Sequence, residues 1–263
     1  MGKKSTGLNV SELGQVFSNN ETVKQMLALR RNSGRVLEPS AGDGAFAFNI
    51  DLNERTAIEF DSFFAKKNGF LHMDFFDYST DQKFNTIIGN PPYVRYQDIH
   101  PDTKKKLKDY DSLFDARSNL YLFFMYKCIQ HLEEGGELIF ITPRDFIKAT
   151  SARKLNEYIF KHGTITNYIE MGDQKIFDGA VPNTAVWRFE KGNFSRKTNE
   201  TLGFRCCNGQ LIFTKKEYPI AFSDIAYVKV GAVSGADKIF AHDDGIDFVY
   251  SKTRTTAKSK KTA

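Results

Sequence analysis

The feature of this sequence that most constrains its fold is the regular alternation of short apolar runs with helical stretches between residues 20 and 189. Each apolar run ends in polar or glycine residues, and the runs predict strands at residues 35–37, 56–59, 70–73, 85–89, 137–142, 164–171 and 184–189. The stretches between them predict helices at residues 20–31, 44–50, 61–68, 119–133 and 151–161. This alternation predicts an α/β fold with a doubly wound, mostly parallel sheet. In such a sheet, ligands bind at the carboxyl ends of the strands.

The charge of the chain is unevenly distributed. Its 263 residues contain 37 Lys and Arg against 32 Asp and Glu, a formal net charge of +5. Residues 251–263 contain five of these bases and no acid, so residues 1–250 carry equal numbers of acids and bases. A uniformly basic surface for nucleic acid is therefore excluded, and any anion-binding surface in the body must be local. We expect residues 251–263 to form a basic disordered tail.

The composition indicates a globular protein of a reducing compartment. Hydrophobic residues make up 41% of the chain and aromatic residues 14%, which is enough to bury a sizeable core. The three cysteines, Cys128, Cys206 and Cys207, form no disulfide framework and no zinc-binding pattern with histidines, so we expect a cytoplasmic protein without a bound metal. No apolar run approaches the length that spans a membrane, so no membrane association is expected.

Acidic residues follow three successive predicted strands. The first strand leads into the turn Glu38-Pro39-Ser40-Ala41-Gly42-Asp43-Gly44, whose small residues let a ligand approach the backbone, although an ordinary strand-to-helix turn fits equally well. Glu59 ends the second strand, where an acid can bind two ribose hydroxyls. Asp74 follows the third strand and can accept a hydrogen bond from an adenine amino group, with Phe75 packed on the ring. Together these residues predict a cofactor that contains adenosine; the alternative is a set of surface acids.

The tetrapeptide Asn90-Pro91-Pro92-Tyr93 follows the fourth predicted strand. Its two prolines restrict the backbone and remove two N–H donors, so the turn presents carbonyl oxygens and a rigid amide. The Asn90 amide oxygen and the Pro91 carbonyl oxygen can each accept one hydrogen of an exocyclic amine. These hydrogen bonds aim the nitrogen lone pair at an electrophile, and the proton leaves after attack. An ordinary proline turn is the alternative.

Further motifs accompany these in a fixed order along the chain. The ordered set is Gly14-Gln15-Val16-Phe17-Ser18, Glu38–Gly44, Glu59, Asp74-Phe75-Phe76, Asn90–Tyr93, Asn119-Leu120-Tyr121, Ile141-Thr142-Pro143, Phe177 and Asn183-Thr184-Ala185-Val186. In this order the sequence resembles the gamma class of S-adenosylmethionine-dependent DNA N6-adenine methyltransferases of type II restriction–modification systems. The resemblance covers about residues 12–250. It implies a seven-stranded Rossmann-like methyltransferase sheet with helices on both faces.

The resemblance also implies a role for each motif. The residues expected to bind S-adenosylmethionine are Phe17, Ser18, Glu38, Pro39, Ser40, Ala41, Gly42, Asp43, Gly44, Glu59, Asp74 and Phe75. Those expected at the reacting base are Asn90, Pro91, Pro92, Tyr93 and Phe177, with Tyr93 and Phe177 packing on an adenine flipped out of double-stranded DNA. A long loop at residues 94–117 carries Lys104, Lys105, Lys106, Lys108 and Arg117, which are expected to bind DNA phosphates or to be a solvated charged surface.

The domain expectation follows from the same resemblance. Residues 1–192 are expected to form the catalytic domain, and residues 193–250 the start of a truncated or minimal target-recognition region, which Gly231–Phe240 resembles. Either a partner chain supplies the rest of target recognition, or the chain is a truncated product. The implied function is site-specific adenine methylation that protects DNA from a cognate restriction endonuclease. The alternatives are an rRNA-base or protein-glutamine N-methyltransferase, and a non-catalytic subunit.

Overall fold

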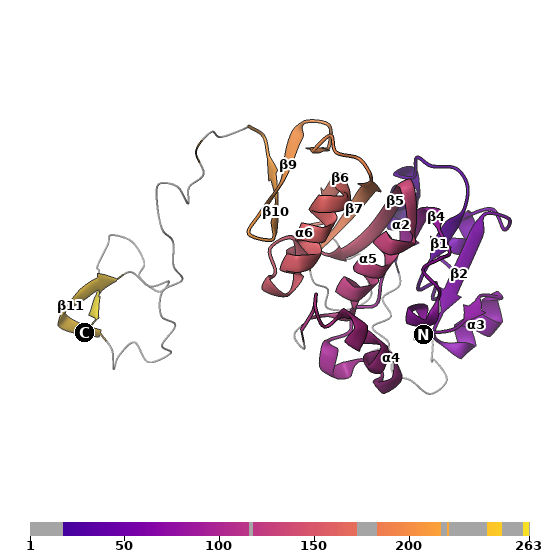
Figure 1. The fold of residues 1–263 in the computed structure, drawn as a ribbon, viewed down its shortest axis with the longest axis horizontal. Coiled ribbons are helices and arrows are strands. Elements are labelled where there is room, and N and C mark those ends of the chain that lie inside the picture. The colour runs from indigo at the N-terminus through magenta and orange to yellow at the C-terminus, as the bar shows by residue number, and fades with distance from the viewer. Residues whose placement is uncertain are drawn as a thin grey trace. The chain divides into compact units, whose positions relative to one another are not determined.

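The computed structural model describes residues 18–115, 118–172, 183–216, 220, 241–248 and 260–262, and for the last two ranges it describes the backbone alone. The chain divides into two compact units, Met1–Glu217 and Tyr218–Ala263. The first unit contains the large sheet and its helices (Figure 1).

The large sheet has seven strands in the order β3-β2-β1-β4-β5-β7-β6. Their bounds are β1 Val36–Glu38, β2 Arg55–Glu59, β3 Leu71–His72, β4 Phe84–Gly89, β5 Leu132–Pro143, β6 Gly163–Glu170 and β7 Thr184–Lys191. Strands β1 to β5 pair in parallel, whereas β7 is antiparallel to both of its neighbours. The predicted doubly wound, mostly parallel sheet is therefore confirmed.

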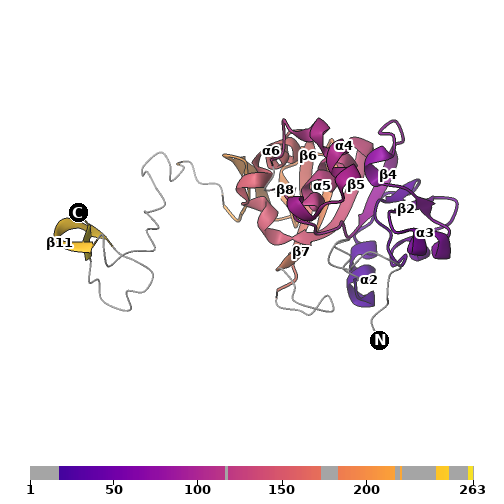
Figure 2. The same ribbon diagram turned by 90° about the horizontal axis from the view of Figure 1, so that it is seen from below.

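Helices cover both faces of this sheet (Figure 2). Their bounds are α2 Asn20–Ala28, α3 Ser62–Asn68, α4 Pro101–Lys106, α5 Leu120–His131 and α6 Arg153–His162. Residues of α2 pack in one core cluster with Val36 and Ile88, whereas residues of α5 and α6 pack in another with Leu37 and Ile87. Because successive side chains of a strand point to opposite faces, covering both faces requires the continuous apolar runs seen in the sequence.

Two segments differ from their sequence-based predictions. The predicted helix at 44–50 is a series of turns that ends in the 3₁₀ segment η1, Ala47–Asn49, because the Glu38 carboxylate accepts a hydrogen bond from the Ala47 N–H (2.7 Å) and draws the chain back to the sheet. The predicted loop at 94–117 contains α4, which begins at Pro101. Proline suits the first turn of a helix, since no intrahelical bond is lost there.

Beyond residue 192 the first unit continues with a three-stranded antiparallel sheet. It consists of β8 Lys197–Thr198, β9 Leu202–Cys207 and β10 Gln210–Thr214. Phe204 and Leu211 are buried in the same core cluster as α6. This compact unit therefore extends past the end of the expected catalytic domain, and the assignment of residues 193–250 to target recognition stays a prediction.

The second unit contains one strand pair. Strands β11 (Ala241–Phe248) and β12 (Lys260–Thr262) are antiparallel. Residues 260–262 thus form a strand where the sequence predicts a disordered tail, and the segment Gly231–Phe240 lies outside the described residues. Across the described part of the chain, no helix is long and apolar enough to cross a membrane.

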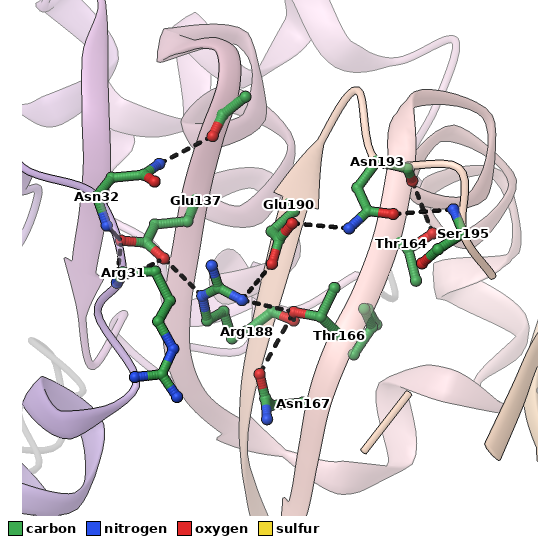
Figure 3. A network of polar contacts seen from close by, with 12 residues as sticks. Arg31, Asn32, Glu137, Thr164, Thr166, Asn167, Arg188, Glu190, Asn193 and Ser195 are labelled. Carbon is green, nitrogen blue, oxygen red and sulfur yellow. Dashed lines mark hydrogen bonds and ion pairs between the residues drawn. The ribbon is translucent and has the colours of Figure 1, made fainter. Parts of the chain in front are cut away.

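A buried ion pair connects the sheet to the end of α2 (Figure 3). The Glu137 carboxylate on β5 accepts hydrogen bonds from Arg188 Nε on β7 (2.5 Å), Thr86 Oγ1 on β4 (2.9 Å), and the backbone N–H groups of Arg31 and Asn32 (2.9 Å each). Because the two N–H groups follow α2, this carboxylate holds the exit of the helix against three strands.

His131, the last residue of α5, is fully buried among aromatic rings. Its ring stacks on Tyr78 at a centroid distance of 5.6 Å and lies 5.4 Å from Phe75, and its Nδ1 lies 2.8 Å from the Gln82 carbonyl oxygen. Burial lowers the pKa of His131 to about 4, because an imidazolium ion would be desolvated at this position. His131 is therefore neutral in the folded protein at neutral pH.

Acidification should destabilise the protein through His131. The pKa is about 6.5 in the unfolded chain and about 4 in the fold, so the unfolded chain takes up the proton first, and stability present above pH 6.5 is lost as the pH falls towards 4. Between pH 7 and pH 4.5, the free energy of unfolding measured with urea should fall by about 1–3 kcal/mol less in His131→Phe than in the wild type. The exposed His72→Gln is the matched control. Identical pH slopes for the His131 variant and the wild type would contradict this prediction.

Candidate active site

A cavity of about 350 Å³ lies at the carboxyl ends of the parallel strands. Glu38 and Glu59 reach it from the ends of β1 and β2, Asp74 from the segment after β3, and Asn90 from the segment after β4. Eight further residues expected at the cofactor or the reacting base also line it: Ser18, Pro39, Ser40, Ala41, Gly42, Asp43, Phe75 and Pro92. The volume is within the usual range for small-molecule sites, about 300–1,000 Å³.

Some expected site residues do not line this cavity. Phe17, Arg117 and Phe177 lie outside the described residues. Pro91 and Tyr93 are not part of the lining, and neither is Gly44. Gly44 has φ +88°, and a Cβ there would lie 2.4 Å from the Phe48 ring, so the backbone conformation and the close packing both require glycine.

Glu38 is almost completely buried, with 3% of its surface exposed. Burial raises the pKa of its carboxyl well above the ordinary value, and the nearby carboxylates of Glu59 and Asp43 raise the pKa further. One oxygen accepts the hydrogen bond from Ala47 N–H. A cationic group bound in the cavity would oppose these effects and favour the ionised carboxylate, so this position suits a positively charged ligand.

Glu59 holds two backbone segments in place. Its carboxylate oxygens accept hydrogen bonds from the N–H of Gly42 (2.5 Å) and the N–H of Asp61 (2.7 Å). Burial raises the pKa of Glu59 as well. A carboxylate has about four acceptor positions, so acceptor capacity remains for a hydroxyl group of a ligand. Glu59 therefore shapes the Gly42 turn and can still accept a hydrogen bond from a ligand.

The Asn90 segment is hydrogen-bonded to other motifs singled out in the sequence. The Asn90 Nδ2 donates to Ser18 Oγ (3.3 Å), and the Ser40 hydroxyl donates to the Asn90 carbonyl oxygen (3.2 Å). The Tyr93 hydroxyl donates to the Ile141 carbonyl oxygen (2.8 Å), and its ring packs edge-on against Tyr121. Burial raises the pKa of the Tyr93 hydroxyl. Four motifs that are far apart in sequence therefore contact this turn.

The lysines expected to bind DNA are in different environments. Lys108 is exposed, and Lys105 is exposed in an ion pair with Asp102 (2.9 Å). Lys104 Nζ donates to the Gln97 carbonyl oxygen (3.2 Å). Lys106 instead pairs with Asp74, which lines the cavity (3.0 Å), and with the exposed Asp77 (2.5 Å). A phosphate would have to compete with these carboxylates for Lys106.

Sequence reasoning missed one wall of the cavity. It is formed by the segment after the Asn90 turn, and its lining residues are Val94, Asp98, Ile99, His100, Pro101 and Thr103. Phe60 also lines the cavity, and its ring lies edge-on to His100 at 5.7 Å. The only sequence signal was the unusual length of the loop, because nothing in its composition shows which side chains turn inward.

The electrostatic character of the lining limits the ligand. Among the described residues that line the cavity are five acids, Glu38, Asp43, Glu59, Asp74 and Asp98, and no lysine or arginine. The rings of Phe46, Phe60 and Phe75 add flat apolar surface. This lining disfavours phosphate-bearing nucleotides and suits a cationic ligand that carries an aromatic ring. Within the part of the chain that the structure describes, no group of three or more His, Cys, Asp or Glu could hold a metal ion.

Comparison with known sequences finds a matching protein family and related proteins. Residues 15–177, more than half of the chain, match the Eco57I restriction-modification methylase family. The type II methyltransferase M.HincII of Haemophilus influenzae is 30% identical over 189 residues, which are 68% of this chain and 38% of that protein. The type II methyltransferase M.AccI of Acinetobacter calcoaceticus is 26% identical over 183 residues, or 62% of this chain and 33% of that protein. The chain thus spans less than two fifths of the length of these relatives.

Solved structures share the fold. The methyltransferase subunit of a type I restriction–modification system from Streptococcus thermophilus superimposes with a TM-score of 0.53 at 14% identity, covering 81% of this chain and 56% of that chain. The M protein of the type I restriction enzyme EcoKI superimposes with a TM-score of 0.53 at 15% identity, covering 74% and 48% of the two chains. At these identities the likeness establishes the fold alone.

Proposed function

The chain belongs to the Eco57I restriction-modification methylase family, and from that membership we propose that it transfers a methyl group from S-adenosylmethionine to N6 of an adenine in double-stranded DNA. The observation that carries this proposal is the cavity itself, in which the strand-end acids and the Asn90 turn meet. In the restriction–modification context, the methyl group would protect the DNA from a cognate nuclease.

The choice of cofactor rests on the match between the cavity lining and S-adenosylmethionine. S-adenosylmethionine supplies a methyl group on a positively charged sulfur, and it carries adenosine without phosphate. The acidic, lysine- and arginine-free lining among the described residues matches that charge. Glu38, with Ser18 and the Pro39–Asp43 turn, would surround the charged amino-acid end; Glu59 would accept from the ribose hydroxyls, and Asp74 and Phe75 would hold the adenine.

The reaction part of the proposal rests on the Asn90 turn. The Asn90 Oδ1 and the Pro91 carbonyl oxygen would each accept one hydrogen of the target amino group, which holds the nitrogen lone pair toward the methyl group. Flipping the base out of the duplex costs a few kcal/mol, which stacking on an aromatic ring offsets. Tyr93 would supply such a ring, and Lys104, Lys105 and Lys108 lie on the loop that follows and would contact phosphates.

A methyl-transfer assay on three substrate classes tests the proposal. The full chain is incubated with labelled S-adenosylmethionine and, separately, with unmethylated genomic DNA, ribosomal RNA and unmodified cell protein. We expect label in DNA alone, released as N6-methyladenine on nucleoside analysis. Label in RNA or protein alone would overturn the DNA assignment. Cofactor binding without turnover on DNA would favour the form of the proposal in which a partner chain supplies target recognition.

A further inference from the structure

Asp74 is held by side chains of α4 as well as by its own backbone segment. The Thr103 hydroxyl donates to Asp74 Oδ2 (2.6 Å), and Lys106 Nζ contacts the same oxygen (3.0 Å). On the other oxygen, Asp74 Oδ1 accepts from the Phe76 N–H (2.9 Å). Three donors therefore fix both the position and the rotation of this carboxylate, which is 9% exposed at the cavity wall.

These contacts determine which hydrogen-bond acceptor position of Asp74 remains for a ligand. A carboxylate has about four acceptor positions, two on each oxygen, so three donors leave one position on Oδ1. Lys106 also places a positive charge beside the carboxylate. A carboxylate accepts hydrogen bonds but donates none. It therefore favours an amino group in the cavity and repels a carbonyl oxygen.

Only one face of α4 contacts Asp74. Thr103 and Lys106 are three residues apart, so they lie on the same side of the helix. Lys105, between them in sequence, is 74% exposed and pairs with Asp102 instead. The run of three lysines thus divides into one that contacts the cavity acid and others that do not.

We propose that Thr103 and Lys106 are positioning residues that set the specificity of the cavity for a 6-amino purine, through the Asp74 carboxylate. This proposal rests on the proposed function, because it takes the adenine of the cofactor to lie against Asp74. Lys106 then belongs to the cofactor site, and the DNA phosphates are left to other side chains of the loop.

The test compares two ligands that differ at one substituent. S-adenosylhomocysteine carries a 6-amino group, and its inosine counterpart, S-inosylhomocysteine, carries a 6-oxo group. Both are titrated calorimetrically into the full chain and into Thr103→Val and Lys106→Met. We expect each variant to bind S-adenosylhomocysteine roughly tenfold more weakly, with the inosine counterpart bound equally well or better, so the preference for adenosine falls. Lys105→Met, the matched control on the same helix, should keep the wild-type preference, as should Thr103→Ser, which retains the hydroxyl.

The outcomes separate this inference from the proposed function. Equal weakening of both ligands would show a merely structural role for α4 and would overturn the inference, as would an unchanged preference with weaker DNA binding by Lys106→Met. If Asp74→Ala loses the preference while Thr103→Val and Lys106→Met keep it, the inference fails and the cofactor proposal stands. If the wild-type chain binds neither ligand, the proposed function itself fails.

Discussion

Replacing Asn90 with alanine should strongly reduce the rate of methyl transfer while the affinity for S-adenosylmethionine stays within about twofold of wild type. The substitution removes the amide oxygen that would accept a hydrogen of the target amine, whereas the acids that surround the proposed cofactor site remain. Loss of one preorganised hydrogen-bonding group in an active site lowers kcat by about 10²–10³-fold, and a comparable loss is expected here. Initial rates of methyl transfer, together with calorimetric titration of S-adenosylmethionine, measure the two effects separately.

The exposed Asn53→Ala is the matched control, because it removes the same side chain from a surface loop. Retention of full activity by Asn90→Ala would sink the catalytic assignment of the turn. A parallel loss of cofactor affinity and activity would instead place Asn90 in cofactor binding, which its position on the cavity wall also allows.

Replacing Arg188 with methionine should be the most destabilising of the substitutions considered. Glu137 is completely buried, and Arg188 Nε is its charged partner on the neighbouring strand. Removing one member of a buried ion pair leaves a desolvated, unpaired charge, at a cost of about 3–5 kcal/mol. The hydrogen bonds from Thr86, Arg31 and Asn32 to Glu137 remain, so we expect the lower end of that range, about 3 kcal/mol, in urea unfolding at pH 7.

A double variant separates the charge effect from packing. Glu137→Met combined with Arg188→Met removes both members of this buried pair, although Glu190, which also pairs with Arg188, then loses its partner. Apolar replacement of a buried ion pair is often neutral or favourable. We therefore expect the double variant to recover part of the stability lost in Arg188→Met, although its three other donors lose their acceptor. Lys105→Met, which breaks an exposed pair, should leave the urea midpoint unchanged. A double variant less stable than Arg188→Met would contradict a dominant charge effect.

The sheet was predictable because its strands are marked by local features of the sequence, the short apolar runs. Residues 138–141 form a continuous apolar run, and the structure buries them on β5, alternately in the two core clusters. In the segment predicted as a helix at 44–50, the Ala47 N–H donates to a distant partner, the Glu38 carboxylate. Helical periodicity is a local property and does not register such a contact.

The part of the site that the geometry of the sheet alone brings together was predictable from the sequence. Glu38 and Glu59 end strands and Asp74 follows one, and parallel strands bring their carboxyl ends to one edge. The wall formed by α4 was not predictable, because the rotation of a short helix about its axis depends on packing. That rotation turns Lys106 toward Asp74 and leaves Lys105 in solvent, although both belong to one run of lysines.

By itself, the sequence determined the class of sheet, the edge at which a ligand would bind and the acids that gather there, because strand periodicity and strand order are local and topological properties. Only the tertiary structure decided what those acids contact. In the structure, Glu59 accepts a hydrogen bond from the Gly42 N–H, and Asp74 contacts Thr103 and Lys106. The Tyr93 hydroxyl points toward β5. The physical reason is that hydrogen-bond partners depend on distances of a few ångströms between segments far apart in the chain, and these exist only once both faces of the sheet are packed.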